Sequence, residues 1–253
     1  MNRESRRFRW RETLATVPLE LRSALSLLTR LPGGAADSSR TGSAAFGLVG
    51  AGLGALAGAT ALVFGPDRSF LGAASALAVL TLVSGALHLD GLADVADALA
   101  APNRRSAERA RRDPAIGAGG AVAVALILLV DAAALAALPV ADVVAALVVA
   151  GSISRAIPAV VAPWAALGKQ GFGAWFAAHS GRGGAVISLA TSLAFALLAH
   201  SLRSAAGWFV GLAAGLAVLA FLTRRMGPPT GDSFGAAVEV AFAASVVAQG
   251  AVR

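Results

Sequence analysis

The sequence predicts an all-α protein that crosses a membrane about seven times. Composition supplies two observations: 57% of the 253 residues are apolar and only 14% are charged, whereas soluble domains carry roughly 25% charged residues. The third observation is that the apolar residues gather into runs about as long as the roughly 20 residues of a transmembrane helix. We therefore expect residues 1–253 to form a single integral membrane domain, a polytopic transmembrane helix bundle.

Seven apolar runs are long enough to span a bilayer. They lie at residues 44–64, 70–89, 117–138, 140–165, 184–200, 205–223 and 234–252. The run 140–165 contains Arg155, Pro158 and Pro163, so we expect this span to be kinked or to end early.

Residues 1–43 precede the bundle at 44–253 and are basic. Apolar side chains recur here at three- and four-residue steps, at Leu14, Val17, Leu21, Leu25 and Leu28. This periodicity predicts an interfacial amphipathic helix at about 14–31. No apolar segment with a small-residue cleavage site follows the Arg-rich residues 1–12 at once, so we expect no cleaved signal peptide.

Small residues at four-residue spacing allow helices to approach closely. One such set is Gly50, Gly54 and Gly58, and a second set is Gly207, Gly211 and Gly215. We expect these faces to pack within the chain; the alternative is that they join two copies in a homo-oligomer.

The basic residues set the expected orientation. With a cytoplasmic N-terminus, seventeen of them fall on the cytoplasmic side and three, Arg68, Arg203 and Arg253, on the other. Cytoplasmic loops are enriched in Lys and Arg, so we expect a multi-pass protein of the bacterial cytoplasmic (inner) membrane. The spread of the basic residues between the runs suits anionic lipid and argues against a nucleic-acid partner. In this orientation the segments 90–97, 109–120 and 227–235 share the cytoplasmic face.

Three carboxylates stand at the end of the second run. In HLDGLADVADAL at 88–99, Asp90, Asp94 and Asp97 follow at steps i, i+4 and i+7, which places them on one face of a helix. Like charges repel at this spacing, so a divalent cation would explain the arrangement. The chain has no cysteine, and carboxylate oxygens favour Mg²⁺. The alternative is a solvated acidic helix end.

The segment ERARRDPAIGAGG at 108–120 is a candidate phosphate site. Arg112 and Asp113 precede a glycine-rich helix start at Gly117. Free backbone N–H groups and an adjacent Arg bind phosphate well, although positive-inside bias and helix initiation also account for these residues.

A second candidate segment is MGPPTGDSFGAAVE at 226–239. It predicts a tight turn at Thr230, Gly231 and Asp232 before the last run.

Two single residues are further candidates. Nearer the second run, His88 is either a metal ligand or base, or a hydrogen-bonded structural group. Arg30 can reach lipid phosphate or substrate.

Carboxylates inside membrane helices are candidates for functional sites. Glu239 lies about two turns inside the last run, and it either pairs with Arg155, the only basic residue inside a run, or is neutral and hydrogen-bonded. Together with Asp131, these two residues would be the relay of a membrane transporter, which is one rival function.

Several of these motifs resemble, in order and spacing, the cobalamin synthase family of adenosylcobinamide-GDP ribazoletransferases. They are LTRLP at 28–32, FGLVGAGLGAL at 46–56, HLDGLADVADAL, RRDPAIGAGG and TGDSFGAAVE. Two departures are Gly47, where the family usually has Pro, and Ala98, where it usually has Gly. A CDP-alcohol lipid phosphotransferase is the nearest rival, but its usual Asp-Gly followed by Ala-Arg does not occur here.

The resemblance implies a Mg²⁺-dependent membrane phosphotransferase of late cobalamin biosynthesis. It would join adenosylcobinamide-GDP to α-ribazole or α-ribazole 5′-phosphate and release GMP. Mg²⁺ would be held by Asp90, Asp94 and Asp97, and phosphate oxygens by Arg112 and Gly117. Asp94, Asp113 and Asp232 would be the catalytic carboxylates. The remaining substrate-binding candidates are Arg30, His88, Arg155, Thr230, Gly231 and Glu239.

Overall fold

The computed structural model describes residues 10–31, 40–103, 106–107, 115–165 and 171–252, with residues 10–18 as backbone alone. Within these ranges the chain is helical and contains no strand, as predicted. The α-helices are α1 (Trp10–Leu28), α2 (Phe46–Leu62), α3 (Ser69–Ser84), α4 (Leu87–Ala100), α6 (Ala118–Ala136), α7 (Val140–Val161), α8 (Phe172–His179), α9 (Arg182–Leu198), α10 (Leu202–Met226) and α11 (Gly231–Ala251). Short 3₁₀ turns lie at Ser43–Ala45, Pro66–Arg68 and Ala162–Trp164.

Six helical segments of the described chain are long and apolar enough to cross a membrane. They contain α2, α3, α6, α7, α10 and α11. A seventh span arises if α8 and α9, which meet at 91°, are counted as one bent crossing. The prediction of a polytopic bundle with about seven spans is therefore confirmed.

The second predicted span is shorter than the run 70–89. α3 ends at Ser84, and Gly85 and Ala86 both adopt left-handed backbone angles, with φ of 65° and 57°. This conformation is easy for Gly and unfavourable for Ala. The two residues break the helix, so α4 starts afresh at Leu87 and leaves the direction of α3.

Helix α7 lies at the centre of the bundle and packs against α2, α9, α10 and α11. Gly50 and Gly54 let α2 approach the backbone of α7 at Gly151 and Leu147. On α10, Gly211 faces Ala241 and Ser245 of α11. Both glycine faces thus serve contacts within the chain, which favours the intramolecular alternative over a seam between two copies.

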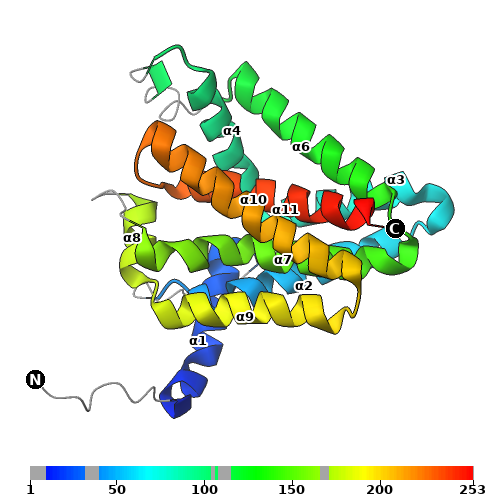
Figure 1. The fold of residues 1–253 in the computed structure, drawn as a ribbon, viewed down its shortest axis with the longest axis horizontal. Helices are drawn as coiled ribbons and strands as arrows, with labels where there is room; N and C mark the ends of the chain where they lie inside the picture. Colours follow the sequence, from blue (N-terminus) through cyan, green and yellow to red (C-terminus); the bar gives the residue numbers. More distant parts are fainter. Residues whose placement is uncertain (1–9, 32–39, 104–105, 108–114, 166–170, 253) are drawn as a thin grey trace, which may run out of the picture.

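One end of the bundle gathers the segments that the charge pattern assigned to one face. Figure 1 shows the outer end of α4, helix α8 and the connection between α10 and α11 at the left, whereas the α2–α3, α6–α7 and α9–α10 connections and the C-terminus lie at the right. Of the segments predicted to share one face, α4 and the connection before α11 therefore lie at the same end of the bundle, whereas residues 109–114 of the third segment lie outside the described residues.

The amphipathic helix is α1, which runs from Trp10 rather than from residue 14. Leu28 is buried, and Leu21 and Leu25 pack against the main apolar core. The C-terminal half of the predicted stripe therefore covers the bundle itself. Leu14 and Val17 belong to the residues whose side chains lie outside the description.

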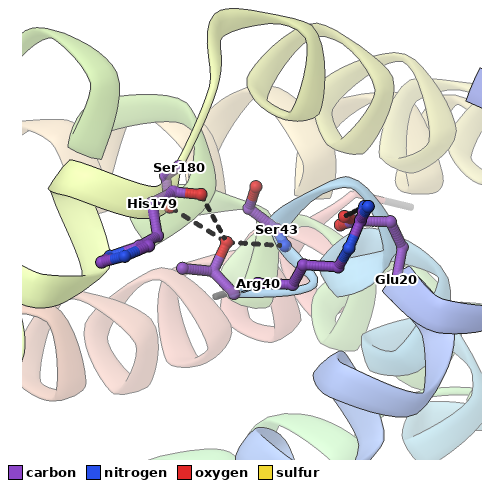
Figure 2. Close-up of polar contacts among 6 residues, drawn as sticks. Glu20, Arg40, Ser43, His179 and Ser180 are labelled. Atoms are coloured by element: carbon purple, nitrogen blue, oxygen red, sulfur yellow. Dashed lines mark hydrogen bonds and ion pairs between the residues drawn. The ribbon is translucent and has the colours of Figure 1, made fainter. Parts of the chain in front are cut away.

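Polar contacts fasten the segment after α1 to the corner between α8 and α9 (Figure 2). The buried Thr41 hydroxyl donates to the carbonyl oxygen of His179 at 3.4 Å and accepts from Ser180 Oγ at 3.3 Å. Beside them, Arg40 forms an ion pair with Glu20 of α1 at 3.4 Å. These contacts fix α8 against the start of α2.

Candidate active site

A pocket of about 220 Å³ opens at the end of the bundle where α4, α8 and α11 meet. We call it the α4–α11 pocket. Its acidic residues are Asp90 of α4 and Asp232 of α11, and His88 also lines it. The apolar side chains of its wall are Leu27, Leu28, Phe46, Leu87, Pro158, Phe172, Phe176 and Phe234. Polar and apolar groups thus occupy the same small cavity.

Two glycines bring the acidic residues together. α4 and α11 cross at Gly91 and Gly235, where a Cβ added to Gly91 would lie 3.0 Å from Asp232 Cα, and one added to Gly235 would lie 3.0 Å from the carbonyl oxygen of His88. Only glycine allows two helix backbones to touch in this way. Asp90 is next to Gly91, and Asp232 lies one helical turn before Gly235, so both residues line the same pocket.

The start of α11 is set by Thr230. Its hydroxyl accepts a hydrogen bond from the Ser233 N–H at 3.4 Å, as an N-cap residue does. Asp232 lies in the first turn, where a negative charge interacts favourably with the helix dipole. The tight turn predicted at Thr230, Gly231 and Asp232 is thus the capped beginning of a helix.

Asp97 has a role that the sequence did not suggest. Its Oδ2 atom accepts from Gly117 N–H at 2.7 Å and its Oδ1 atom from Gly120 N–H at 2.8 Å. The carboxylate therefore caps α6, whose own N-cap residue Gly117 has no side chain to do so. The N–H group predicted to hold phosphate is bonded to Asp97 in this structure.

Asp94 is half-buried one turn from Asp90 on α4. In the described part of the chain, no three His, Asp or Glu side chains converge as a metal cage. Mg²⁺ is commonly bound by one or two carboxylates together with substrate phosphates and water. Asp90 and Asp232 on one pocket fit that open type of site, whereas Asp97 is already engaged by two N–H groups.

His88 is buried beneath the pocket. Burial, and secondly the charge of Arg155, lower the pKa of His88 to about 3, so the imidazole is neutral at ordinary pH. Its Nδ1 atom has no hydrogen-bond partner among the described residues. A neutral His can bind a metal or a substrate atom, and the prediction of a site role stands untested.

Arg155 and Glu239 line a different cavity, of about 10 Å³, together with Asp131. Arg155 donates to Ser154 Oγ at 2.9 Å, and its guanidinium lies 5.3 Å from the centre of the Phe242 ring. Neither Arg155 nor Glu239 lines the α4–α11 pocket, so the structure does not bring these two predicted substrate-binding residues to Asp90 and Asp232.

One further predicted site residue, Arg30, lies apart from the lining. Arg30 is exposed after α1 and packs over Gly85, at the break between α3 and α4. Arg112 and Asp113 lie outside the described residues, so their predicted roles stay predictions.

The aromatic wall of the pocket was missed by sequence reasoning. Helix α8, with Phe172 and Phe176, lies between the predicted runs 140–165 and 184–200 and belongs to neither of them. The cluster FGAWF at 172–176 was the available signal. Phe46 and Phe234 come from distant parts of the chain, and no local pattern joins them to it.

A helix bundle of six or seven spans with carboxylates in a pocket at one end defines the class of this protein: a multi-pass membrane protein with the architecture of an integral membrane enzyme. A family profile described as cobalamin-5-phosphate synthase matches residues 20–249. The chain therefore belongs to the cobalamin synthase family, and it is a transferase of cobalamin synthesis.

Comparison with individual proteins leads to the same family. The chain is 34% identical over 248 residues to an adenosylcobinamide-GDP ribazoletransferase of Halorubrum lacusprofundi, covering 89% of this chain and 94% of that protein. It is 31% identical to proteins of the same name from Frankia casuarinae (90% of this chain, 93% of that protein) and Klebsiella pneumoniae (86% and 94%). No solved structure matches the chain significantly. The family match sets aside the lipid phosphotransferase and transporter alternatives.

Proposed function

We propose that the chain catalyses a Mg²⁺-dependent transfer that joins adenosylcobinamide-GDP to α-ribazole or α-ribazole 5′-phosphate. The products would be adenosylcobalamin or its 5′-phosphate, together with GMP. The observation that carries this proposal is the presence of Asp90 and Asp232, from two different helices, on one pocket beside a capped helix start.

The reaction needs a phosphorus atom held between an entering and a leaving oxygen. A ribose hydroxyl of the acceptor would form a new P–O bond to the phosphorus nearer the cobinamide, and the bond to the bridging oxygen would break, so that this oxygen leaves with GMP. Bound Mg²⁺ would neutralise diphosphate charge and stabilise the leaving oxygen.

The protein's own residues would position these groups. Asp90 and Asp232, with Asp94 one turn from Asp90, would hold the metal against the diphosphate. The proton of the attacking hydroxyl needs an acceptor, and Asp232 and Asp113 are the two candidates. The Thr230 cap would keep Asp232 in place during the reaction.

The charge pattern supports a cytoplasmic active face. The pocket lies at the end of the bundle that the basic residues assign to the cytoplasm. We propose that the protein lies in the bacterial cytoplasmic membrane with this end inside.

The test is direct assay of both products. Purified protein in liposomes would receive adenosylcobinamide-GDP radiolabelled in its guanosine, α-ribazole and Mg²⁺. We expect GMP and a new corrinoid in equal amounts, and neither product after chelation of divalent ions. GMP without the new corrinoid would indicate hydrolysis, and turnover without divalent ions would contradict the role of the metal.

A further inference from the structure

The apolar wall of the α4–α11 pocket has no role in metal or phosphate binding. It is built around a row of aromatic rings on α8 and α2. The rings of Phe172 and Phe176 are stacked with centroids 5.9 Å apart, and those of Phe176 and Phe46 are stacked at 5.5 Å. Phe176 is 1% exposed, whereas Phe172, at the end of this row, is 47% exposed. One aromatic ring of the stack is therefore left accessible at the pocket.

Phe172 lies beside the acidic residues. A Cβ added to Gly231 would lie 3.3 Å from Phe172 Cδ1, so this ring packs against the residue that precedes Asp232. A flat group stacked on Phe172 would be held next to the carboxylate that is proposed to act on the acceptor. The polar contacts of Thr41 with His179 and Ser180 hold the end of α8 in place (Figure 2).

We propose that this wall is the subsite for the aromatic base of the acceptor, with Phe172 as its stacking face; this inference rests on the function proposed above. Aromatic side chains bind bases by stacking regardless of hydrogen bonding. The volume of about 220 Å³ is below the roughly 300–1,000 Å³ of drug-sized sites. A single heterocyclic base fits this space, and a corrin macrocycle does not.

The chemistry of the wall distinguishes the benzimidazole of α-ribazole from the guanine of the donor. Guanine carries several donors and acceptors, which lose free energy when they are buried without partners. Among the described residues that line the pocket, polar side chains are limited to His88, Asp90 and Asp232. A dimethylbenzimidazole buries an apolar ring and offers one free ring nitrogen, so it leaves fewer polar atoms without a partner than guanine does.

An exposed aromatic ring near a bundle end also serves as a membrane anchor. Trp164, which is 57% exposed and does not line the pocket, has the exposure expected of such an anchor. Phe172 differs because it lines the cavity and continues a stack that leads into the core.

The experiment compares Phe172→Ala with Phe172→Tyr, which retains a stacking ring, in the full chain in liposomes. Phe70→Ala is the matched control, because Phe70 is 57% exposed at the start of α3, at the opposite end of the bundle. We expect Phe172→Ala to raise the KM for α-ribazole about ten-fold and to leave the KM for adenosylcobinamide-GDP within about two-fold. Phe70→Ala should behave as wild type, and Phe172→Tyr should restore most of the affinity for α-ribazole that Phe172→Ala loses, because it retains the stacking ring.

Equilibrium dialysis of α-ribazole without donor separates this inference from the proposed function. We expect wild type to bind it and Phe172→Ala to bind it about ten-fold more weakly. The inference is overturned if wild type does not bind, if Phe172→Ala binds equally well, or if the KM for the donor rises instead. Failure of the proposed function is a different result: wild type would bind α-ribazole and release no GMP.

Discussion

The carboxylate of Asp97 on α4 accepts a hydrogen bond from the backbone N–H of Gly117 at 2.7 Å, across the connection to α6. A second bond comes from Gly120. The glycines are needed because a Cβ at Gly120 would lie 2.6 Å from the Asp97 carboxylate. Asp97 therefore ties α4 to α6, while Asp90 on the same helix lies at the pocket.

Because Asp97 caps a helix and Asp90 lines the pocket, we expect Asp97→Asn to lower the stability of the protein and Asp90→Asn to leave the stability unchanged. An Asn at position 97 presents an N–H₂ group to backbone donors, so we expect a loss of about 1–2 kcal/mol of stability. Thermal unfolding in detergent should show a lower midpoint for Asp97→Asn, with Asp90→Asn near wild type. Equal midpoints for the two variants would contradict the capping role.

The crossing of α4 and α11 predicts a sharp requirement for glycine. In Gly91→Ala the added methyl group meets backbone atoms of Asp232 at 3.0 Å, which cannot move aside as a side chain can. We expect about 1–3 kcal/mol of destabilisation and a displaced Asp232. Gly52→Ala is the control, since nothing lies within 4 Å of its added Cβ. Unfolding midpoints and kcat should fall for Gly91→Ala alone.

The cap of α11 predicts an effect of Thr230 on activity as well as stability. Thr230→Ala should lose about 1 kcal/mol, and Thr230→Ser should lose little because it retains the hydroxyl. Ser201→Ala removes the equivalent cap of α10, where Ser201 Oγ accepts from Ser204 N–H at 3.0 Å. We expect similar stability losses for the two Ala variants and a loss of kcat only at Thr230. A loss of kcat at Ser201→Ala would show that stability alone sets the rate.

The sequence predicted the helices better than the site. Each apolar run became a helix, because burial of apolar side chains in a membrane and internal hydrogen bonding leave no other local choice. Two errors remain. The second span ends early because Ala86 adopts a left-handed conformation that apolarity does not reveal, and helix α8 lies outside the predicted runs.

The site depended on contacts between distant segments. Spacing placed Asp90, Asp94 and Asp97 on one helix face, but only the fold shows that Asp97 caps α6 and that Asp90 shares a pocket with Asp232. Phe172 belongs to the aromatic cluster FGAWF, but the cluster does not show which ring lines a pocket, so its proposed role required the three-dimensional arrangement.

The orientation can be tested by cysteine labelling, since the chain has no cysteine of its own. The reagent reaches only exposed positions, so the cysteines are placed at exposed residues. Asn103→Cys and Pro228→Cys should resist a membrane-impermeant thiol reagent in intact cells, and Ser69→Cys at the other end of the bundle should react. Permeabilised cells provide the control. Labelling of Asn103→Cys but not of Pro228→Cys from outside would place the end of α4 and the start of α11 on opposite faces of the membrane. That result would contradict the predicted orientation.

The central claim is that Asp90 and Asp232 act together in one site, and a double-mutant cycle on GMP release tests it most directly. Residues that act as a unit are not additive when both are removed. We expect Asp90→Asn and Asp232→Asn each to fall below about a tenth of the wild-type rate, and the double variant to be little slower than the worse single variant. Multiplicative losses in the double variant, or a single variant near the wild-type rate, would contradict a shared site.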